Sequence, residues 1–562
     1  MKPPRITGKK LIRFSLYFLG LLLLIIIFPA LFYHQEFNPL PLPSKYVKGV
    51  YHVHSNFSDG SGSLEEITRA SAQLNQDFVI LTDHGNPNLM SAQSTTWMNS
   101  VLLIGGSELS LNAGHLAVFG FKVPPYRFPP EPQEAIDDIN RNSGVSFVSH
   151  PFDDKIPWTD WDIRNFSGIE VFNSYSFARK TGWFTLLKFP LQYLFNKRYA
   201  LLNTLFYPKK NIEHWDSLNQ KNKYLAIYAC DAHAVMPISK SIRPQYPSYK
   251  SMFDIFNTYV KIERNLSRDP HESAEIIKRA IKKGHFFNVV EAIAPANGFE
   301  VYFIDDTEHK VETGESTPVA SGNIHLRLPF DFETDIHIKQ NGEIFQNISR
   351  NLKKNLTCQI KKAGIYRIEI FVSENHFKTI PWILTNPFFI GVEYPEYSIL
   401  HDPATTLLIN REQLFSVETS PGSTGTTNTR QSSRNEWLTT FDFELKQDPG
   451  LKDFWSALAC RGSYDFSNHT GFSFQSRSDR ICRFWIEFRT QTNRGKIWYR
   501  HSFIAEPNWN THSIPFHKFQ VIRGSKVKPD LSSIYAIFVS INNAIAYPDT
   551  RGTMQLKNLG LY

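Results

Sequence analysis

The chain has 562 residues, of which 41% are hydrophobic and 20% are charged. These proportions are ordinary for globular protein and exclude a mainly disordered chain, and the length predicts roughly three to four domains. The net charge of +8 comes from Lys and Arg residues that are scattered rather than gathered in blocks. Such a charge does not by itself indicate a nucleic-acid-binding protein.

Residues 14–33 carry no charge, and Leu21 to Phe28 is an unbroken run of Leu, Ile and Phe. Twenty helical residues span about 30 Å, the thickness of a bilayer's hydrocarbon core. Five basic residues precede the run, so we expect residues 1–13 to be a cytoplasmic tail and residues 14–33 a single-pass transmembrane signal anchor. The rest of the chain would then be extracytoplasmic, in a periplasm or outside the cell. A cleaved signal peptide is the alternative, but no clear small-x-small cleavage site follows.

Residues 34–47 contain Pro39, Pro41 and Pro43 and predict an extended spacer. The next stretch, Tyr51 to Gly60, holds His52 and His54 on a β-branched run, followed by Asp59. Residues at i and i+2 of a strand point to the same side, so the two imidazoles are expected to share one face.

Five further polar motifs lie beside short apolar runs of strand length. They are Thr82-Asp83-His84, Gly106-Ser107-Glu108, Gly114-His115-Leu116, Ser149-His150-Pro151 and Cys230-Asp231-Ala232-His233. Imidazoles and carboxylates held on strand ends are typical ligands of a polynuclear metal centre. The sequence has neither a Gly-x-Ser-x-Gly elbow nor a Walker-type phosphate loop. The residues therefore predict a metal-assisted hydrolase.

In their order and context these motifs resemble the PHP family, the polymerase and histidinol phosphatase superfamily of metal-dependent phosphoesterases. The resemblance covers about Lys48 to Val290. It implies a site for two to three divalent ions in which Glu108 bridges two positions. The first position would be completed by His52, His54 and Asp231, the second by His115 and His150, and the third by Asp59, His84 and His233. Some family members have His where this chain has Asp59, and an oxygen ligand there would favour manganese, iron or magnesium over zinc, so the metal stays open.

Helices alternate with these strands. Ser63 and Glu66 form a capping box that opens a helix through about Asn75, and residues 132–142 and 273–283 predict two more helices. Alternation of this kind predicts an α/β barrel with its site at the carboxyl ends of the strands. With the resemblance, residues 48–296 are expected to form a distorted (β/α)7-type PHP barrel. Asp83 adjoins His84 and cannot face the same side, so we expect it to orient a ligand.

An aromatic and basic insertion between Asn173 and Lys223 interrupts the pattern. Arg179 and Lys180 in it are candidates for binding a substrate phosphate, although a solvated helix face explains them equally well. The stretch Trp183 to Tyr207 also suits an amphipathic element lying on a bilayer. Glu170, just before the insertion, is expected to be a structural or orienting carboxylate.

Short alternating strands follow. Residues 297–396 predict a small β-sandwich, residues 397–436 a linker or flexible loop rich in Ser, Thr and Gly, and residues 437–562 a jelly-roll β-sandwich. The last module weakly resembles galactose-binding-type carbohydrate-binding modules, which implies a glycan partner. Trp455, Trp498 and Trp509 would stack on sugars, or be buried as Trp commonly is in such sandwiches. Cys460 and Cys482 are close enough in sequence to pair if that side is oxidising.

The fold class expected overall is thus multidomain, α/β followed by β. The leading function is hydrolysis of a phosphate ester by an exported, membrane-anchored enzyme, with the substrate undefined. An amidohydrolase-type reaction at the same metals and a non-catalytic, glycan-binding envelope protein are the alternatives. The membrane anchor disfavours nucleic acid as a partner.

Overall fold

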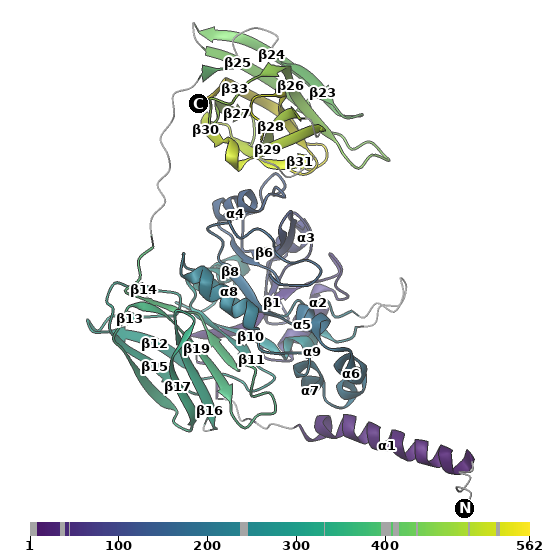
Figure 1. The fold of residues 1–562 in the computed structure, drawn as a ribbon, viewed down its shortest axis with the longest axis vertical. Coiled ribbons are helices and arrows are strands. Elements are labelled where there is room, and N and C mark those ends of the chain that lie inside the picture. The colour runs from purple at the N-terminus through teal and green to yellow at the C-terminus, as the bar shows by residue number, and fades with distance from the viewer. Residues whose placement is uncertain are drawn as a thin grey trace, which may run out of the picture. The chain divides into compact units, whose positions relative to one another are not determined.

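The computed structural model describes residues 8–33, 37, 40–43, 45–235, 245–330, 332–394, 406–408, 415–433, 436–492, 495–523 and 529–562. The chain divides into two compact units (Figure 1). Unit 1 comprises Met1–Lys122 and Ile139–Pro395, and unit 2 comprises Val123–Asp138 and Glu396–Tyr562. Much of the predicted spacer 34–47 and of the predicted linker 397–436 lies outside the described residues.

The N-terminal helix α1 spans Gly8–Phe32. Its segment Ser15–Phe32 is long and apolar enough to cross a membrane, a property that it shares with signal sequences. Its exposed side chains include Leu21, Leu24, Phe28 and Phe32.

Two mixed sheets form the α/β part of unit 1. The strands of the first are β1 (Tyr46–Val53), β2 (Phe78–Leu81), β3 (Thr96–Met98), β4 (Val101–Ile104), β10 (Phe256–Lys261) and β11 (Phe286–Val290). The strands of the second are β5 (Gly106–Leu111), β6 (Gly114–Phe119), β7 (Val145–Val148), β8 (Gly168–Asn173) and β9 (Leu225–Ala229), in that order across the sheet. Single bridges join the sheets, Val53 to Ala232 and His84 to Glu108. The strand ladder is thus continuous within each sheet, and the distorted (β/α)7-type barrel stays a prediction.

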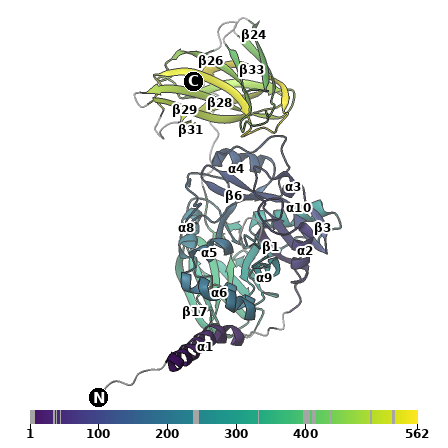
Figure 2. The same ribbon diagram turned by 90° about the vertical axis from the view of Figure 1, so that its right-hand side faces the viewer.

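The helices of unit 1 lie around these sheets (Figure 2). They are α2 (Leu64–Ala72), α3 (Leu89–Ala92), α4 (Pro132–Arg141, shared with unit 2), α5 (Ser174–Lys180), α6 (Trp183–Phe195), α7 (Lys197–Leu202), α8 (Lys209–Asn219), α9 (Tyr249–Phe253) and α10 (Pro270–Lys283). The predicted capping box is present, since Ser63 and Glu66 bond each other's backbone N–H groups. Gly284 ends α10 at φ 80°, a left-handed conformation that glycine adopts without strain.

The region predicted as a separate sandwich shares a sheet with the α/β part. Its strands are β12 (Glu300–Asp305), β13 (Lys310–Val311), β14 (Ser316–Thr317), β15 (Gly322–Arg327), β16 (Thr334–Gln340), β17 (Glu343–Asn351), β18 (Asn355–Ile360), β19 (Gly364–Val372), β20 (Ile383–Thr385) and β21 (Phe388–Ile390). Strands β13, β12, β15 and β18 form one layer, whereas β20 pairs with β11 and so extends the first sheet. The boundary expected at residue 296 therefore does not separate two compact bodies.

A buried ion pair strengthens this junction. Arg367 on β19 makes two bonds of 2.7 Å to the Asp216 carboxylate on α8, and its Nη1 lies 2.6 Å from Glu369 Oε1. The Arg367 side chain is only 3% exposed.

Unit 2 is a two-layered β-sandwich. One sheet holds β22 (Thr406–Leu407), β24 (Thr424–Ser433), β25 (Glu436–Glu444), β27 (Gly471–Ser478), β30 (Asn510–Pro515) and β33 (Arg551–Leu561), and the other holds β23 (Ser416–Thr419), β26 (Trp455–Tyr464), β28 (Cys482–Thr492), β29 (Gly495–Ala505), β31 (Gln520–Arg523) and β32 (Ile534–Asn542). A core rich in Phe, including Phe441, Phe472, Phe484 and Phe488, fills the space between them. The expected jelly-roll-like region is thus an all-β body.

The flexible loop expected up to residue 436 is wrong for residues 416–419 and 424–433, which form β23 and β24. Strand β24 pairs with β25 along its length and is the edge strand of its sheet. An edge strand needs few apolar residues because it stays largely exposed, and its repeated Thr suits a strand. Cys460 and Cys482 are both buried and are not joined by a disulfide, and Cys460 Sγ lies 2.9 Å from the Tyr464 hydroxyl.

The segment Val123–Asp138 belongs to unit 2 through a buried cluster of charged groups. Arg500 Nε and Nη2 each lie 3.0 Å from Glu131 Oε1. Arg483 pairs with Asp138, and the backbone N–H of Ser502 donates to Glu134 Oε2 at 3.1 Å.

Candidate metal centre

The nine predicted ligands come from six strands and the turns that follow them. His52 lies on β1 and His54 just after it, with Asp59 in the next turn. Glu108 is on β5 and His115 on β6. His84 follows β2, His150 follows β7, and Asp231 and His233 follow β9. The structure brings all nine side chains together in unit 1.

Glu108 lies at the middle of the cluster and is 1% exposed. Its Oε2 is 3.3 to 3.4 Å from ring nitrogens of His52, His54 and His84. Its Oε1 is 3.2 Å from His115 Nδ1 and 3.3 Å from His150 Nε2. The two oxygens of one carboxylate therefore face two separate sets of imidazoles, as a bridging ligand requires.

Asp231 completes the first set. Its Oδ1 lies 3.6 Å from His52 Nε2 and 3.4 Å from His54 Nε2. His52, His54 and Asp231 are all buried, and one atom of each can face a common ion.

A second group lies nearer the surface. Asp59, whose side chain is 51% exposed, has Oδ1 3.3 Å from His233 Nε2 and Oδ2 3.7 Å from His84 Nε2. His54 Nδ1 is 3.7 Å from the same carboxylate. A neutral imidazole has one lone pair for a metal, so His54 serves either this group or the buried one.

Several buried ligand atoms in the cluster have no hydrogen-bond partner, which suits them to bind a cation. Among the described residues, the buried atoms without a hydrogen bond include Glu108 Oε1, Asp231 Oδ1, His54 Nδ1, His115 Nδ1 and His150 Nδ1. Buried polar atoms are normally paired, because burial without a partner costs free energy. Carboxylate oxygens and imidazole nitrogens are the ligands that divalent transition metals accept, so the residues fit two or three such ions.

The electrostatics of the cluster keep its carboxylates ionised. Burial opposes ionisation of Glu108 and Asp231, but the surrounding imidazoles, that of His52 foremost, outweigh it and hold both pKa values well below the ordinary range. Burial likewise opposes a proton on His150 and His233, yet the neighbouring carboxylates raise each pKa to about 9. Protonation of these two imidazoles is thus favoured beside the carboxylates, whereas burial and the neighbouring His233 lower the pKa of His54 to about 4.

Glu170 and Asp83 hold the predicted ligands or the turns that carry them in place. Glu170 Oε1 lies 2.5 Å from His52 Nδ1, and its Oε2 accepts from the backbone N–H of His150 at 2.9 Å. Asp83 accepts from the Ser55 N–H and hydroxyl and from the Ser58 hydroxyl, at 2.6 to 2.9 Å. Asp83 therefore fixes the turn that leads to Asp59, and Glu170 orients a predicted ligand directly.

Three of the predicted ligands have left-handed backbone. The φ angles are 66° at His52, 31° at His150 and 46° at Asp231. Such values cost free energy for a residue with a Cβ, and they occur where the surrounding structure imposes them, commonly at functional sites. Periodicity and motif spacing contain no signal for this feature.

Arg179 and Lys180 lie beside the cluster but have partners within the chain. Arg179 pairs with Asp153, and Lys180 donates to the carbonyl of Phe152. Both hold the turn that follows His150, and their predicted contact with a substrate phosphate stays a prediction. Lys180 also lines a pocket of about 70 Å³ next to His150.

Sequence reasoning missed Tyr175, the second residue of α5. Its ring centroid is 5.1 Å from that of His233, and the side chain is 43% exposed. The available signal was its place directly after β8, at the strand end where the other site residues gather.

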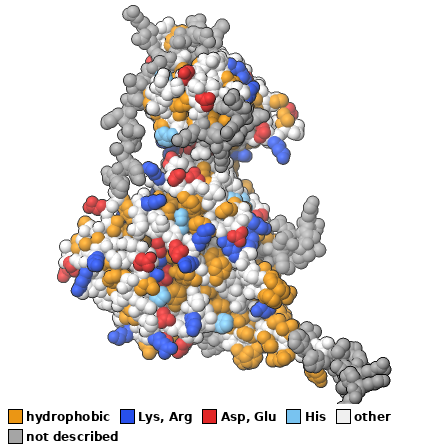
Figure 3. Space-filling model, viewed as in Figure 1, with side chains coloured by type: hydrophobic (Ala, Val, Ile, Leu, Met, Phe, Trp, Pro, Cys, Tyr) orange, Lys and Arg blue, Asp and Glu red, His pale blue; other side chains and the backbone are white. Residues whose placement is uncertain are grey.

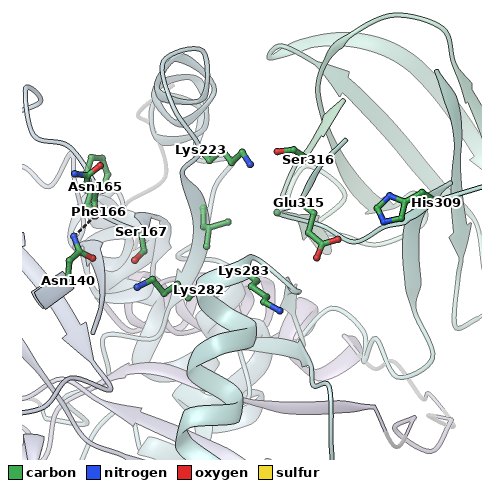
Figure 4. Close-up of a pocket in the computed structure, with 12 residues that line it drawn as sticks. Asn140, Asn165, Phe166, Ser167, Lys223, Lys282, Lys283, His309, Glu315 and Ser316 are labelled. Atoms are coloured by element: carbon green, nitrogen blue, oxygen red, sulfur yellow. Dashed lines mark hydrogen bonds between the residues drawn. The ribbon is translucent and has the colours of Figure 1, made fainter. Parts of the chain in front are cut away.

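A larger pocket of about 630 Å³ lies elsewhere in unit 1. Lys223, Lys282 and Ser167 line one side of it, and Glu315 and His309 line the other (Figure 4). None of the nine predicted ligands is among its lining residues.

No protein-family model and no curated protein matches the chain. Among solved structures, a two-domain protein from Bacteroides vulgatus containing a predicted PHP-like metal-dependent phosphoesterase is 15% identical, covers 63% of this chain and 99% of its own, and has a TM-score of 0.31. A family 11 carbohydrate-binding module of a Clostridium thermocellum cellulase is 15% identical over 29% of this chain and 95% of its own, with a TM-score of 0.23. A family 30 module from the same organism is 12% identical over 28% and 95%, with a TM-score of 0.22. At these scores the likenesses assign no function to either unit.

Proposed function

We propose that unit 1 is a metal-dependent phosphoesterase. The observation that carries the proposal is the position of Glu108, whose two oxygens face two sets of imidazoles contributed by separate strand ends. The order of the ligand motifs along the chain, which resembles that of PHP phosphoesterases, supports phosphate esters as the substrate class.

The distances support the three ligand sets that the family resemblance implies. His52, His54 and Asp231 hold one ion with Glu108, and His115 and His150 hold another with the opposite oxygen. Asp59, His84 and His233 hold a third at the exposed end. Bound divalent cations supply the Lewis acidity that polarises a phosphoryl oxygen and makes water a nucleophile near neutral pH.

The remaining side chains position this set. Glu170 keeps His52 in one ring orientation, and Asp83 holds the turn before Asp59. Asp59 is 51% and His84 31% exposed, so the cluster is open to solvent on this side, where an ester can approach. Tyr175 forms part of that rim.

The proposal also includes a location in the membrane and a glycan partner. Helix α1 anchors the chain in a membrane with the basic end in the cytoplasm and both units exported. In unit 2, the predicted sugar-stacking residues Trp498 and Trp509 are partly exposed, and Arg489 and Arg477 lie 3.7 and 4.9 Å from their ring centroids. Partly exposed Trp rings support a glycan partner for unit 2.

The test is metal content together with turnover of p-nitrophenyl phosphate and bis-p-nitrophenyl phosphate by the full chain. We expect at least two transition-metal equivalents and hydrolysis of one of the esters. The His52→Ala, Asp231→Ala double variant should lose both, and Glu343→Gln, on exposed β17, should lose neither. Metal without turnover of either ester would favour the amidohydrolase alternative, and a metal-free wild type would overturn the proposal.

A further inference from the structure

The insertion around α6 has an unusual charge pattern. Between Glu170 and Glu213 there is no acidic residue, whereas Lys and Arg occupy seven positions: Arg179, Lys180, Lys188, Lys197, Arg198, Lys209 and Lys210. A stretch with one sign of charge is attracted to a surface of the opposite sign, and anionic lipid headgroups provide such a surface.

Helix α6 has its apolar side turned outward. Trp183 is 64%, Leu187 70% and Leu194 76% exposed, and these positions recur at helical spacing on one face. The opposite face carries Gln192 and Tyr193, which are buried. A helix on the surface of a water-soluble body has the reverse arrangement, so the outward face calls for an apolar partner.

Helix α6 is also fixed against the last turns of α1. Gln192 Nε2 donates to the carbonyl of Ile26 at 3.2 Å, and Asn196 Nδ2 donates to those of Ala30 and Tyr33 at 3.1 and 2.8 Å. The outward apolar side chains of α6 thereby continue the exposed apolar surface of α1, visible as orange atoms at the lower right of Figure 3.

We infer that α6 is an interfacial membrane helix, whose Trp183, Leu187 and Leu194 face lies among the headgroups and upper acyl chains of an anionic bilayer. The apolar face supplies the burial, and Lys188 on α6 and Lys197 just after it supply attraction to anionic headgroups. Four of the other basic residues, namely Arg179, Lys180, Arg198 and Lys209, pair with carboxylates of the chain. The bonds to Ile26, Ala30 and Tyr33 place this face where α1 leaves the membrane. The inference does not depend on the reaction catalysed.

This contact bears on the metal centre because α5 and α6 are consecutive. Tyr175 of α5 borders His233, and only Thr181 and Gly182 separate α5 from α6. An α6 held in the interface fixes the rim of the centre relative to the lipid surface, so the centre cannot swing freely on the spacer after α1.

The test is a cysteine scan of α6 in the full chain, with a spin label at each position from 183 to 195. The four native cysteines are buried, so labelling is directed to the introduced one. The protein is reconstituted in vesicles of phosphatidylcholine with a minority of phosphatidylglycerol. Collision of the label with oxygen and with a water-soluble nickel chelate is then measured by electron paramagnetic resonance.

For a helix in the interface, the two accessibilities vary along the sequence with the helical period and in opposite phase. Oxygen collision is greatest, and nickel collision least, at positions 183, 187 and 194. In-phase variation, with both reagents reaching the same positions, means that the face is in water and overturns the inference. Spin–spin broadening at 187 without high oxygen collision means that a second copy covers the face, which also overturns it.

A label at Met90 on α3, 63% exposed, is the matched control. It should collide freely with the nickel chelate in the same vesicles. Low oxygen collision at position 187 together with high oxygen collision at position 90 would overturn the inference, because α3 and not α6 would then lie in the lipid.

Discussion

Glu170 and His52 lie 118 residues apart in the sequence and meet at 2.5 Å, Oε1 to Nδ1. Because the carboxylate faces Nδ1, the other ring nitrogen points toward Glu108 and Asp231. A carboxylate that binds the far side of a ligating imidazole fixes its tautomer and raises its basicity.

Glu170→Gln should therefore weaken metal binding by about 10- to 100-fold without unfolding the protein. Both oxygens of Glu170 accept hydrogen bonds, one at His52 and the other at the His150 backbone and Asn173. A glutamine has an NH2 group in place of one carboxylate oxygen, and this group cannot accept a hydrogen bond, so the contact at that position is lost. Competition with a chelator measures the affinity, and Glu343→Gln is the control. Unchanged affinity in Glu170→Gln would show that the carboxylate does not orient the site.

Glu108→Gln and Asp59→Asn should differ in the number of ions that they release. Glu108 faces two imidazole sets, so its variant should lose occupancy at two positions and all turnover. Asp59 is half exposed and contacts only the outer group, so its variant should lose at most one equivalent. Elemental analysis of the two purified variants distinguishes the outcomes, and equal losses would contradict a bridging role for Glu108.

Arg367→Ala should destabilise unit 1 by about 3 to 5 kcal/mol, because it leaves the buried Glu369 and the partly buried Asp216 carboxylates without their cation. Arg327 pairs with Glu300 on the surface at 49% exposure, so Arg327→Ala should cost about 0 to 1 kcal/mol. Urea unfolding followed by circular dichroism gives both values. A small effect at Arg367 would mean that the junction of α8 and β19 is held by apolar packing alone.

The packing of the segment Val123–Asp138 against the rest of unit 2 should become less stable as pH rises through neutrality. Burial, aided by the carboxylate of Glu134, outweighs the attraction of Arg500 and raises the pKa of Glu131 to about 7. A carboxyl with a raised pKa stabilises the folded form fully below its unfolded value near 4.5, and this contribution is lost as pH rises toward 7.

Hydrogen exchange of peptides covering this segment, corrected for the intrinsic rate, provides the measurement. Protection should fall between pH 5 and pH 8 in the wild type, and the fall should be smaller in Glu131→Gln, which keeps the shape and no charge. A wild-type segment protected equally at both pH values would refute the assignment.

The sequence predicts which side chains gather in the cluster because each lies on or soon after a short apolar strand of one of the two sheets. That these side chains bind metal ions stays a prediction. The sequence also predicts α2 and α10 from their caps, which are local signals. It does not reveal that Glu170 binds His52, because that contact depends on how β8 and β1 are placed in space. The left-handed backbone at His150 and Asp231 is likewise imposed by the assembled fold.

Long-range pairing explains the wrong boundaries. Strand β24 was expected to be a loop because its apolar content is low, and only its partner β25 makes it a strand. The packing of Val123–Asp138 within unit 2 depends on Arg483 and Arg500, which lie more than 340 residues later in the chain. Local composition carries no information about either contact.

The pairing of β11 with β20 limits where the chain can be cut. Phe286–Val290 has the sequence FFNVV and is buried at every position, with β10 on one side and β20 on the other. A protease cut or a stop codon near residue 296 removes β20 and leaves this strand as a bare apolar edge, which invites edge-to-edge aggregation. The part that carries the candidate metal centre and the strands that follow it must therefore be made and folded as one piece.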